Sequence, residues 1–329
     1  MSLDAPLVAA ATLRRESLAD FDSTADDATY QLQLAHVLLD GGYDGVSTMG
    51  EALEGGDHGL GTLDRLDGEL VIVDGVPWQI DFRGVATIVA PEAPIPFAIV
   101  STLHNPSTSR VRDCSLENLA SQIEALVDDA GAVVAVRVEG TFQRVLLRSV
   151  RPQERPYRPY SEVVLTDEVR WELAPFEGVF IGFRFPDISG GDIIPGLHLH
   201  GLSSDQSTGG HNYELHVTDA VVSVGVSHEI IVALPDRGMV DLLETPHSLR
   251  MVQRVLLRRG PRSAEEVAGS LSISPGEAVR RLEWLADRGF VEELAAGVAG
   301  LGGTTRWRMR LAPKNARTGR RPSDLLTDL

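Results

Sequence analysis

Short β-rich runs, separated by clusters of Gly, Pro and Asp, make up most of the chain as far as Asp236, and they restrict it to a fold built on sheets. Tyr30–Leu39 and Leu116–Val127 instead carry apolar residues at three- and four-residue spacing, which predicts helices, with Ser115 as N-cap of the second. We therefore expect an α/β (α+β) class with largely antiparallel sheets. The clearest predicted strands are Glu69–Val73, Ala132–Val138, Val179–Phe185 and Ala220–Val226.

The pattern changes after the turn residues 234–238, where helical periodicity replaces the β-rich runs. We place a domain boundary there, so that residues 1–238 form the first domain and residues 239–312 a second, smaller one. Its second helix begins with Ser263 and Glu266, which are spaced as a capping box. The elements expected in the smaller domain are the helices Ser248–Arg259, Ser263–Leu271 and Gly276–Arg288 and a hairpin of Phe290–Leu294 with Thr305–Leu311.

A helix, a helix-turn-helix and a hairpin in this order resemble a winged helix-turn-helix domain. The third helix, which would be the recognition helix, mixes basic and acidic side chains, and this mixture weakens the case for tight DNA contact. A protein-binding or dimerising role is an equal alternative. The basic residues 313–329 are expected to form a disordered arm. The charged residues of the third helix are Glu277, Arg280, Arg281, Glu283, Asp287 and Arg288.

Charge is divided unevenly between these two parts. The formal net charge of the whole chain is −17. From Met239 to the end, 15 Lys and Arg residues stand against 11 Asp and Glu residues, a balance of +4, whereas the preceding part has 15 against 36, a balance of −21. Because an acidic surface repels nucleic acid, any DNA contact would fall to the second part.

The chain has one cysteine and one lysine, and this scarcity excludes several kinds of site. Cys114 is the single cysteine, which excludes an internal disulfide framework and a cysteine-rich zinc cage, so a metal site must use histidines and carboxylates. Lys314 is the single lysine, which argues against Schiff-base catalysis. No run approaches the roughly 18 apolar residues that a membrane span needs, and we expect a cytoplasmic protein with no membrane partner.

The most informative segment contains three histidines. His198 and His200 are two residues apart, so in a strand their imidazoles project from the same face. The Ser-, Asp- and Gly-rich residues 201–210 are long enough to turn the chain back and bring His211 beside them on an adjacent strand. Three neutral imidazoles suit Zn²⁺ and leave coordination positions open, as catalytic zinc sites do.

A polar sheet face is the other interpretation of the same residues. An isolated His-x-His on a strand is more often such a face than a metal site, and it is the third histidine after two glycines that favours the metal. The remaining histidines lack such grouping and are treated as structural or surface residues. They are His36, His58, His104, His216, His228 and His247.

The chain resembles the alpha-acetolactate decarboxylase family over most of Tyr30–Pro235. Several matches occur in order, including segments similar to that family's Gly-x-Gly-Thr-Phe and Leu-Asp-Gly-Glu-Leu signatures and the three histidines with their spacing. The matching segments are Gly59–Leu63, Leu66–Leu70, Pro96–Ala98, Arg148–Val150 with Gln153 and Pro156-Tyr157, Gly182-Phe183, Phe185-Pro186, Pro195–His200 and Gly209–His211.

This resemblance implies two sheet-containing halves, a homodimer and a zinc cofactor. The residues that it implies for the site are His198, His200 and His211 as zinc ligands, Glu69 and Arg148 as catalytic residues and Thr62 in the substrate pocket. On the residues alone, Glu69 could merely follow a turn, and Arg148 could be a surface partner for a carboxylate.

The chain also departs from the family pattern. Leu63 stands where the family has an aromatic residue and Gly201 where a Phe is typical, and both changes could enlarge the pocket. The family has a further glutamate near its C-terminus that reaches the active site. No residue aligns with it, although Glu244 lies in the neighbourhood, because the helical part replaces that region.

The function that the resemblance implies is the zinc-dependent decarboxylation of 2-acetolactate to acetoin. Loss of CO₂ leaves an electron pair that must be delocalised into the adjacent ketone, and with no lysine for an imine a Lewis-acidic zinc is the simplest electron sink. Two alternatives stay open. The enzyme could act on another 2-hydroxy-3-oxo acid, or the chain could be a metabolite-sensing transcription regulator whose C-terminal part binds DNA.

Overall fold

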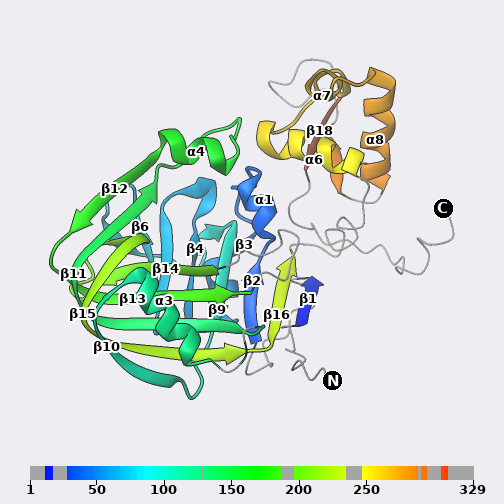
Figure 1. Ribbon diagram of the computed structural model, residues 1–329. Coiled ribbons are helices and arrows are strands. Elements are labelled where there is room, and N and C mark those ends of the chain that lie inside the picture. Colours follow the sequence, from blue (N-terminus) through cyan, green and yellow to red (C-terminus); the bar gives the residue numbers. More distant parts are fainter. Residues whose placement is uncertain are drawn as a thin grey trace, which may run out of the picture.

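The structure is a computed structural model and describes residues 12–17, 28–127, 129, 131–186, 196–234, 247–287, 290–294 and 305–309. Most of the predicted boundary at residues 234–238, Glu244 and the predicted arm at residues 313–329 lie outside these residues. Within them, two large sheets and several helices form the α+β class that the sequence predicts (Figure 1).

The first sheet joins eight described strands, and most of its pairs are antiparallel. The exception is β16, which pairs in parallel with β1 and β2 and so brings residues near 230 beside residues near 30. In sheet order the strands are β1 (Thr12–Ser17), β16 (Glu229–Leu234), β2 (Ala28–Leu32), β9 (Phe97–Ser101), β4 (His58–Thr62), β5 (Glu69–Val73), β6 (Val76–Ile80) and β7 (Ala86–Ile88).

The second sheet is antiparallel and curls onto itself. Its strand β11 pairs with β15 along one edge and with β13 and then β12 along the other, while β14 joins β13 to β15. The strands β11, β13, β14 and β15 therefore pair in a closed circle. In sheet order the strands are β10 (Ser107–Ser115), β15 (Gly209–Ser227), β14 (Gly196–Ser203), β13 (Phe176–Phe185), β11 (Val133–Val150) and β12 (Glu168–Leu173).

The two sheets face each other across buried apolar side chains. Val71 and Ile80 of the first sheet meet Ile181 and Leu202 of the second in one such cluster. Helix α2 packs on the other side of the first sheet, and α3 packs on the other side of the second. The short elements of this part are α1 (Ala35–Leu39), α2 (Met49–Leu53), α3 (Leu116–Ala125), α4 (Tyr160–Thr166), a 3₁₀ turn (Asp64–Leu66) and the paired strands β3 (Ser47–Thr48) and β8 (Pro94–Ile95).

Most of the predicted elements are confirmed. The four clearest predicted strands lie in β5, β11, β13 and β15, with β11 starting at Val133, and Ser115 caps α3 by accepting a hydrogen bond from the Asn118 backbone N–H. The predicted helix Tyr30–Leu39 is wrong in its first half, because Tyr30 belongs to β2, which is buried between β16 and β9. Gln33, at a φ of 68°, separates this strand from α1.

Residues 247–309 contain helices and a hairpin in the predicted order, with a hydrophobic cluster of their own. Ser263 and Glu266 form the predicted capping box. No helix of the described residues is long and apolar enough to cross a membrane. The elements are α6 (His247–Arg259), α7 (Ala264–Leu271), α8 (Pro275–Asp287), β17 (Val291–Leu294) and β18 (Arg306–Met309). The division into separate domains and a winged-helix role stay predictions.

The basic side chains of α8 are engaged within the protein. Arg280 and Arg281 both pair with Glu277, and Arg281 also donates to the Ser248 carbonyl at 3.1 Å. A phosphate group would compete with Glu277 for both arginines, of which Arg280 is 69% exposed and Arg281 20% exposed. The described part of α8 therefore adds no support to the DNA-binding alternative.

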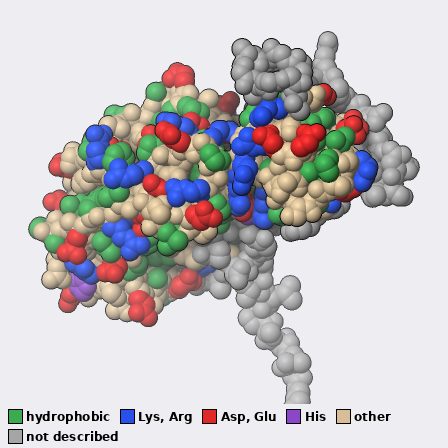
Figure 2. Space-filling view, turned by 90° about the horizontal axis from the view of Figure 1, so that it is seen from above, with side chains coloured by type: hydrophobic (Ala, Val, Ile, Leu, Met, Phe, Trp, Pro, Cys, Tyr) green, Lys and Arg blue, Asp and Glu red, His purple; other side chains and the backbone are tan. Residues whose placement is uncertain are grey.

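Helix α6 joins the helical part to the part that carries the two sheets, and it lies above α1 and beside α4 (Figure 1). The Asp40 carboxylate accepts from Arg254 at 2.5 Å and from Arg258 at 3.1 Å, and the Asp40 carbonyl accepts from Nε of Arg258 at 2.5 Å. The Arg258 carbonyl accepts from the Tyr157 backbone N–H at 2.5 Å. Figure 2 shows basic side chains gathered along this junction.

Replacing Asp40 by Asn removes the charge that the two arginines of α6 share. We expect a loss of on the order of 1 kcal/mol of docking free energy, because the pair is partly exposed and screened by solvent. Hydrogen exchange would then be faster at the Tyr157 amide. Asp74→Asn, which breaks an exposed pair with Arg137, is the control, and unchanged exchange at Tyr157 in the Asp40 variant would contradict the assignment.

Candidate metal centre

Three histidines meet where β14 turns back into β15. His198 and His200 lie on one face of β14, and His200 is directly opposite His211 across the antiparallel pair. The turn between them is held by Asp205, whose carboxylate accepts from the hydroxyls of Ser203 and Ser207. The predicted return of the chain is therefore confirmed.

The nitrogen atoms of these histidines converge on one point. Nδ1 of His211 lies 3.0 Å from Nε2 of His198 and 3.2 Å from Nε2 of His200, and one ligand atom from each residue lies within 4.8 Å of the others. Tetrahedral zinc at about 2.05 Å from each nitrogen would separate neighbouring ligand atoms by about 3.3 Å. The described side chains could thus hold one metal ion with little movement.

The protonation states also suit a metal. Burial lowers the pKa of His198 to about 4, and the positive charge of Arg148 acts in the same direction. Burial likewise holds the pKa values of His200 and His211 well below the ordinary value. Nδ1 of His200 lies 2.7 Å from the Leu70 carbonyl, which only accepts, so this nitrogen carries the proton and Nε2 keeps its lone pair.

The predicted catalytic residues lie beside this centre. Nη1 of Arg148 donates to Oε1 of Glu69, and Oε2 of Glu69 is 3.4 Å from Nε2 of His200. The side chains of Arg148 and Glu69 are 8% and 7% exposed, so Arg148 is not the surface partner that the sequence also allowed. Burial raises the pKa of Glu69 to about 7, although the Arg148 charge lowers it. Their catalytic roles stay predictions.

Strand register explains how residues far apart in the sequence meet. Arg170 of β12, Arg148 of β11, His211 of β15, His200 of β14 and Ile181 of β13 are successive partners in one row across the second sheet. Directly opposite residues point to the same side of a sheet. The row therefore presents the guanidinium groups and imidazoles together.

Sequence reasoning missed three side chains around Arg148. Glu168, at the start of β12, lies 3.6 Å from Nε of Arg148 and has a side chain only 3% exposed. The rings of Tyr160 and Tyr213 each lie 5.8 Å from the Arg148 guanidinium carbon. The one signal in the sequence is that Tyr213 follows His211 by two residues and so shares its strand face.

Thr62 is close to the site, but its hydroxyl is already used. Thr62 is buried directly opposite Glu69, and its hydroxyl donates to the Gly68 carbonyl at 2.7 Å. This bond supports the turn that leads into Glu69. A direct role in the substrate pocket stays a prediction.

The two residues that depart from the family pattern lie in packed surroundings. Leu63 is 7% exposed and packs in the core cluster with Met49 and Leu70. A Cβ atom at Gly201 would lie 2.6 Å from Cε1 of Phe180, so that ring already fills the space.

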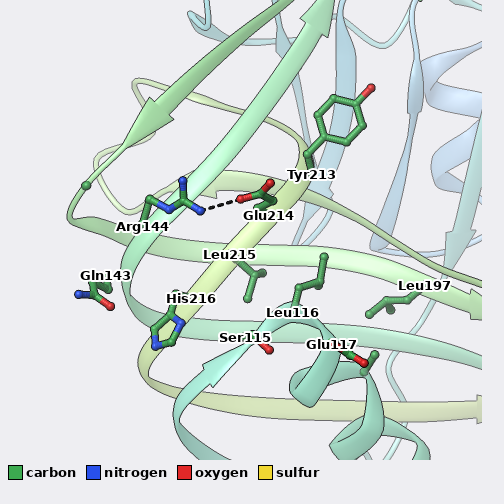
Figure 3. Close-up of a pocket in the computed structure, with 12 residues that line it drawn as sticks. Ser115, Leu116, Glu117, Gln143, Arg144, Leu197, Tyr213, Glu214, Leu215 and His216 are labelled. Atoms are coloured by element: carbon green, nitrogen blue, oxygen red, sulfur yellow. Dashed lines mark hydrogen bonds and ion pairs between the residues drawn. The ribbon is translucent and has the colours of Figure 1, made fainter.

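The large cavity of about 820 Å³ in Figure 3 does not include the histidine centre. It lies between α3 and the second sheet, where Leu116, Leu197 and Leu215 line it. Tyr213 is at its edge, with the ring turned away from these leucines (Figure 3). We place the chemistry at the histidines, because His198 and His211 are only partly buried there and stay accessible.

Two facing sheets with an accessible three-histidine centre between them define a β-rich protein with a candidate catalytic metal site. The alpha-acetolactate decarboxylase family model matches residues 29–240. The chain therefore belongs to the alpha-acetolactate decarboxylase family and is an enzyme of the carboxy-lyase class.

Individual relatives agree with this membership. The chain is 35% identical to an alpha-acetolactate decarboxylase of Methylococcus capsulatus over 65% of this chain and 82% of the relative. It is 33% identical to one of Methanosarcina mazei, over 67% and 76%. The structure of alpha-acetolactate decarboxylase from Bacillus subtilis strain 168 superposes with a TM-score of 0.62 and 28% identity, covering 71% of this chain and 99% of that one.

His211→Ala should lower the affinity for a divalent metal at least about 100-fold, because loss of even an indirect partner of a metal ligand costs about 10- to 100-fold. Titration of metal-free protein with Zn²⁺ against a competing chelator measures this. His216→Ala is the matched control, since His216 lies on the same strand and pairs with Asp113 at the surface. Wild-type affinity in the His211 variant would contradict the site.

Proposed function

We propose that the chain decarboxylates 2-acetolactate to acetoin with a zinc ion held by His198, His200 and His211. The observation that carries this proposal is the convergence of three neutral imidazoles with the Arg148–Glu69 pair between the two sheets. Family membership supports the substrate, since the relatives are alpha-acetolactate decarboxylases.

The donor set favours zinc among the common metals. Three nitrogen ligands suit Zn²⁺, whereas Mg²⁺ and Ca²⁺ prefer oxygen ligands. When bound, zinc would supply a Lewis acid that polarises the ketone and hydroxyl oxygens of the substrate. The partial exposure of His198 and His211 leaves a side from which a substrate can approach.

Arg148 is suited to bind the substrate carboxylate. Its guanidinium can form two parallel hydrogen bonds to a carboxylate, and its burial strengthens them. The rings of Tyr160 and Tyr213 both lie near its guanidinium, each with its centroid 5.8 Å from the guanidinium carbon. To bind substrate in this way, Arg148 would exchange its contact with Glu69 for one with the substrate.

Glu69 is suited to deliver the proton. When the bond to the carboxylate breaks, its electron pair moves into the adjacent ketone and gives an enediolate. A proton must then add to the carbon that lost CO₂, and acetoin results. Because burial raises the pKa of Glu69 to about 7, its carboxyl group can hold this proton near neutral pH and release it.

The remaining parts of the proposal concern specificity and assembly. Another 2-hydroxy-3-oxo acid would offer the same chelating oxygens and carboxylate, so a panel of such acids decides between these substrates. We retain a homodimer as a prediction, which sedimentation of the full chain tests.

Arg148→Lys should lower kcat/KM for acetoin formation about 100-fold, since an ammonium group cannot reproduce the two parallel hydrogen bonds. Acetoin is measured after incubation of the zinc-loaded protein with 2-acetolactate. The control is Arg144→Lys, an exposed change on the same strand, which should stay within about twofold of wild type. Stoichiometric zinc without acetoin, or full turnover in His200→Ala, would overturn the proposed function.

A further inference from the structure

Glu168 is a second buried carboxylate on the side of Arg148 that faces away from Glu69. Its Oε1 accepts from Nε of Arg170 at 2.6 Å, and its Oε2 accepts from the Tyr213 hydroxyl at 2.7 Å. Burying a carboxylate is costly unless it is paired. These two partners give each carboxylate oxygen of Glu168 a hydrogen-bond donor at the edge of the candidate active site.

Nε of Arg148 is a buried donor for which the described residues supply no hydrogen-bond acceptor. The nearest paired oxygen is Oε2 of Glu168, at 3.6 Å, which is beyond hydrogen-bonding distance. A movement of about 0.5 Å would close this contact to an ordinary hydrogen bond. Arg148 therefore has a second carboxylate available at its Nε while Glu69 holds Nη1.

Tyr213 connects this carboxylate to the metal centre. Its ring lies edge-on to the His211 imidazole, with centroids 5.6 Å apart, while the Arg170 guanidinium carbon lies 4.4 Å from its centroid. The hydroxyl of the same ring donates to Glu168. Movement of Glu168 would consequently change the contacts of both Arg148 and Tyr213.

We propose that Glu168 is a positioning residue for substrate binding. Its carboxylate would move the short distance to Nε of Arg148 and accept from it, so that the guanidinium keeps its orientation when the substrate carboxylate replaces Glu69. It also keeps the buried guanidinium paired during this exchange. The inference rests on the proposed function, because it assumes a substrate whose carboxylate binds Arg148.

Glu168→Gln tests the inference, since the amide keeps the size of the side chain and loses its charge. We expect KM for 2-acetolactate to rise about tenfold, with kcat within about threefold of wild type, because Glu168 acts on carboxylate binding and not on the departing bond. Binding of 2,3-dihydroxy-2-methylbutanoate, which has no ketone and cannot decarboxylate, should weaken by the same factor in calorimetry.

Glu172→Gln is the matched control on the same strand. Glu172 is half exposed and pairs with Arg144, so its loss should leave KM and analogue binding unchanged. In an Arg148→Lys background, Glu168→Gln should weaken substrate and analogue binding little further, because its effect on binding depends on Arg148. If Glu168 had only a structural role, the two substitutions would weaken binding additively, and Glu168→Gln would lower the unfolding temperature.

The outcomes separate this inference from the proposed function. Three results would overturn the role of Glu168 while wild type forms acetoin. The KM of Glu168→Gln could equal that of Glu172→Gln, or Glu168→Gln could lower kcat alone. Its loss of substrate binding could also add fully to that of Arg148→Lys. If Glu168→Gln fails to fold, Tyr213→Phe decides, because a raised KM supports the network and an unchanged KM overturns it. If wild type neither forms acetoin nor binds the analogue, both proposals fail.

Discussion

The pairing of β14 with β15 is the constraint on which the rest of the site depends. It places His200 opposite His211, and the pairing of β15 with β11 then places His211 opposite Arg148. A shift of either pairing by one residue would turn the imidazoles to opposite faces of the sheet. The convergence of the three histidines is therefore a consequence of backbone hydrogen bonding in the second sheet.

A buried ion pair connects the second sheet to the first beside the three histidines. Glu69 comes from β5 and Arg148 from β11, and His200 donates to the Leu70 carbonyl next to Glu69. A buried ion pair is strongly destabilising when it loses one partner, so both sheets must be in place for either charge to be tolerated. The proposed chemistry lies where the fold has this requirement.

The sequence predicted the strands, the second helix and the histidine cluster because each depends on local periodicity or spacing. Glu69 and Arg148 were found only through the family resemblance, since nothing local shows that β5 and β11 meet. Glu168 and Tyr160 were missed because strand register and a tertiary contact place them near Arg148. The helix predicted from Tyr30 failed because burial between two strands outweighed the helical spacing.

The closed circle of β11, β13, β14 and β15 has a consequence for how the protein behaves in a crowded solution. The strand that carries two of the histidines pairs with β13 along its length and with β15 from His200 to Leu202, so only this last stretch has partners on both sides and is closed to a strand from another molecule. The free edges of the second sheet belong to β10 and β12 instead. Intermolecular pairing would begin there, and the pairing of His200 with His211 would be kept.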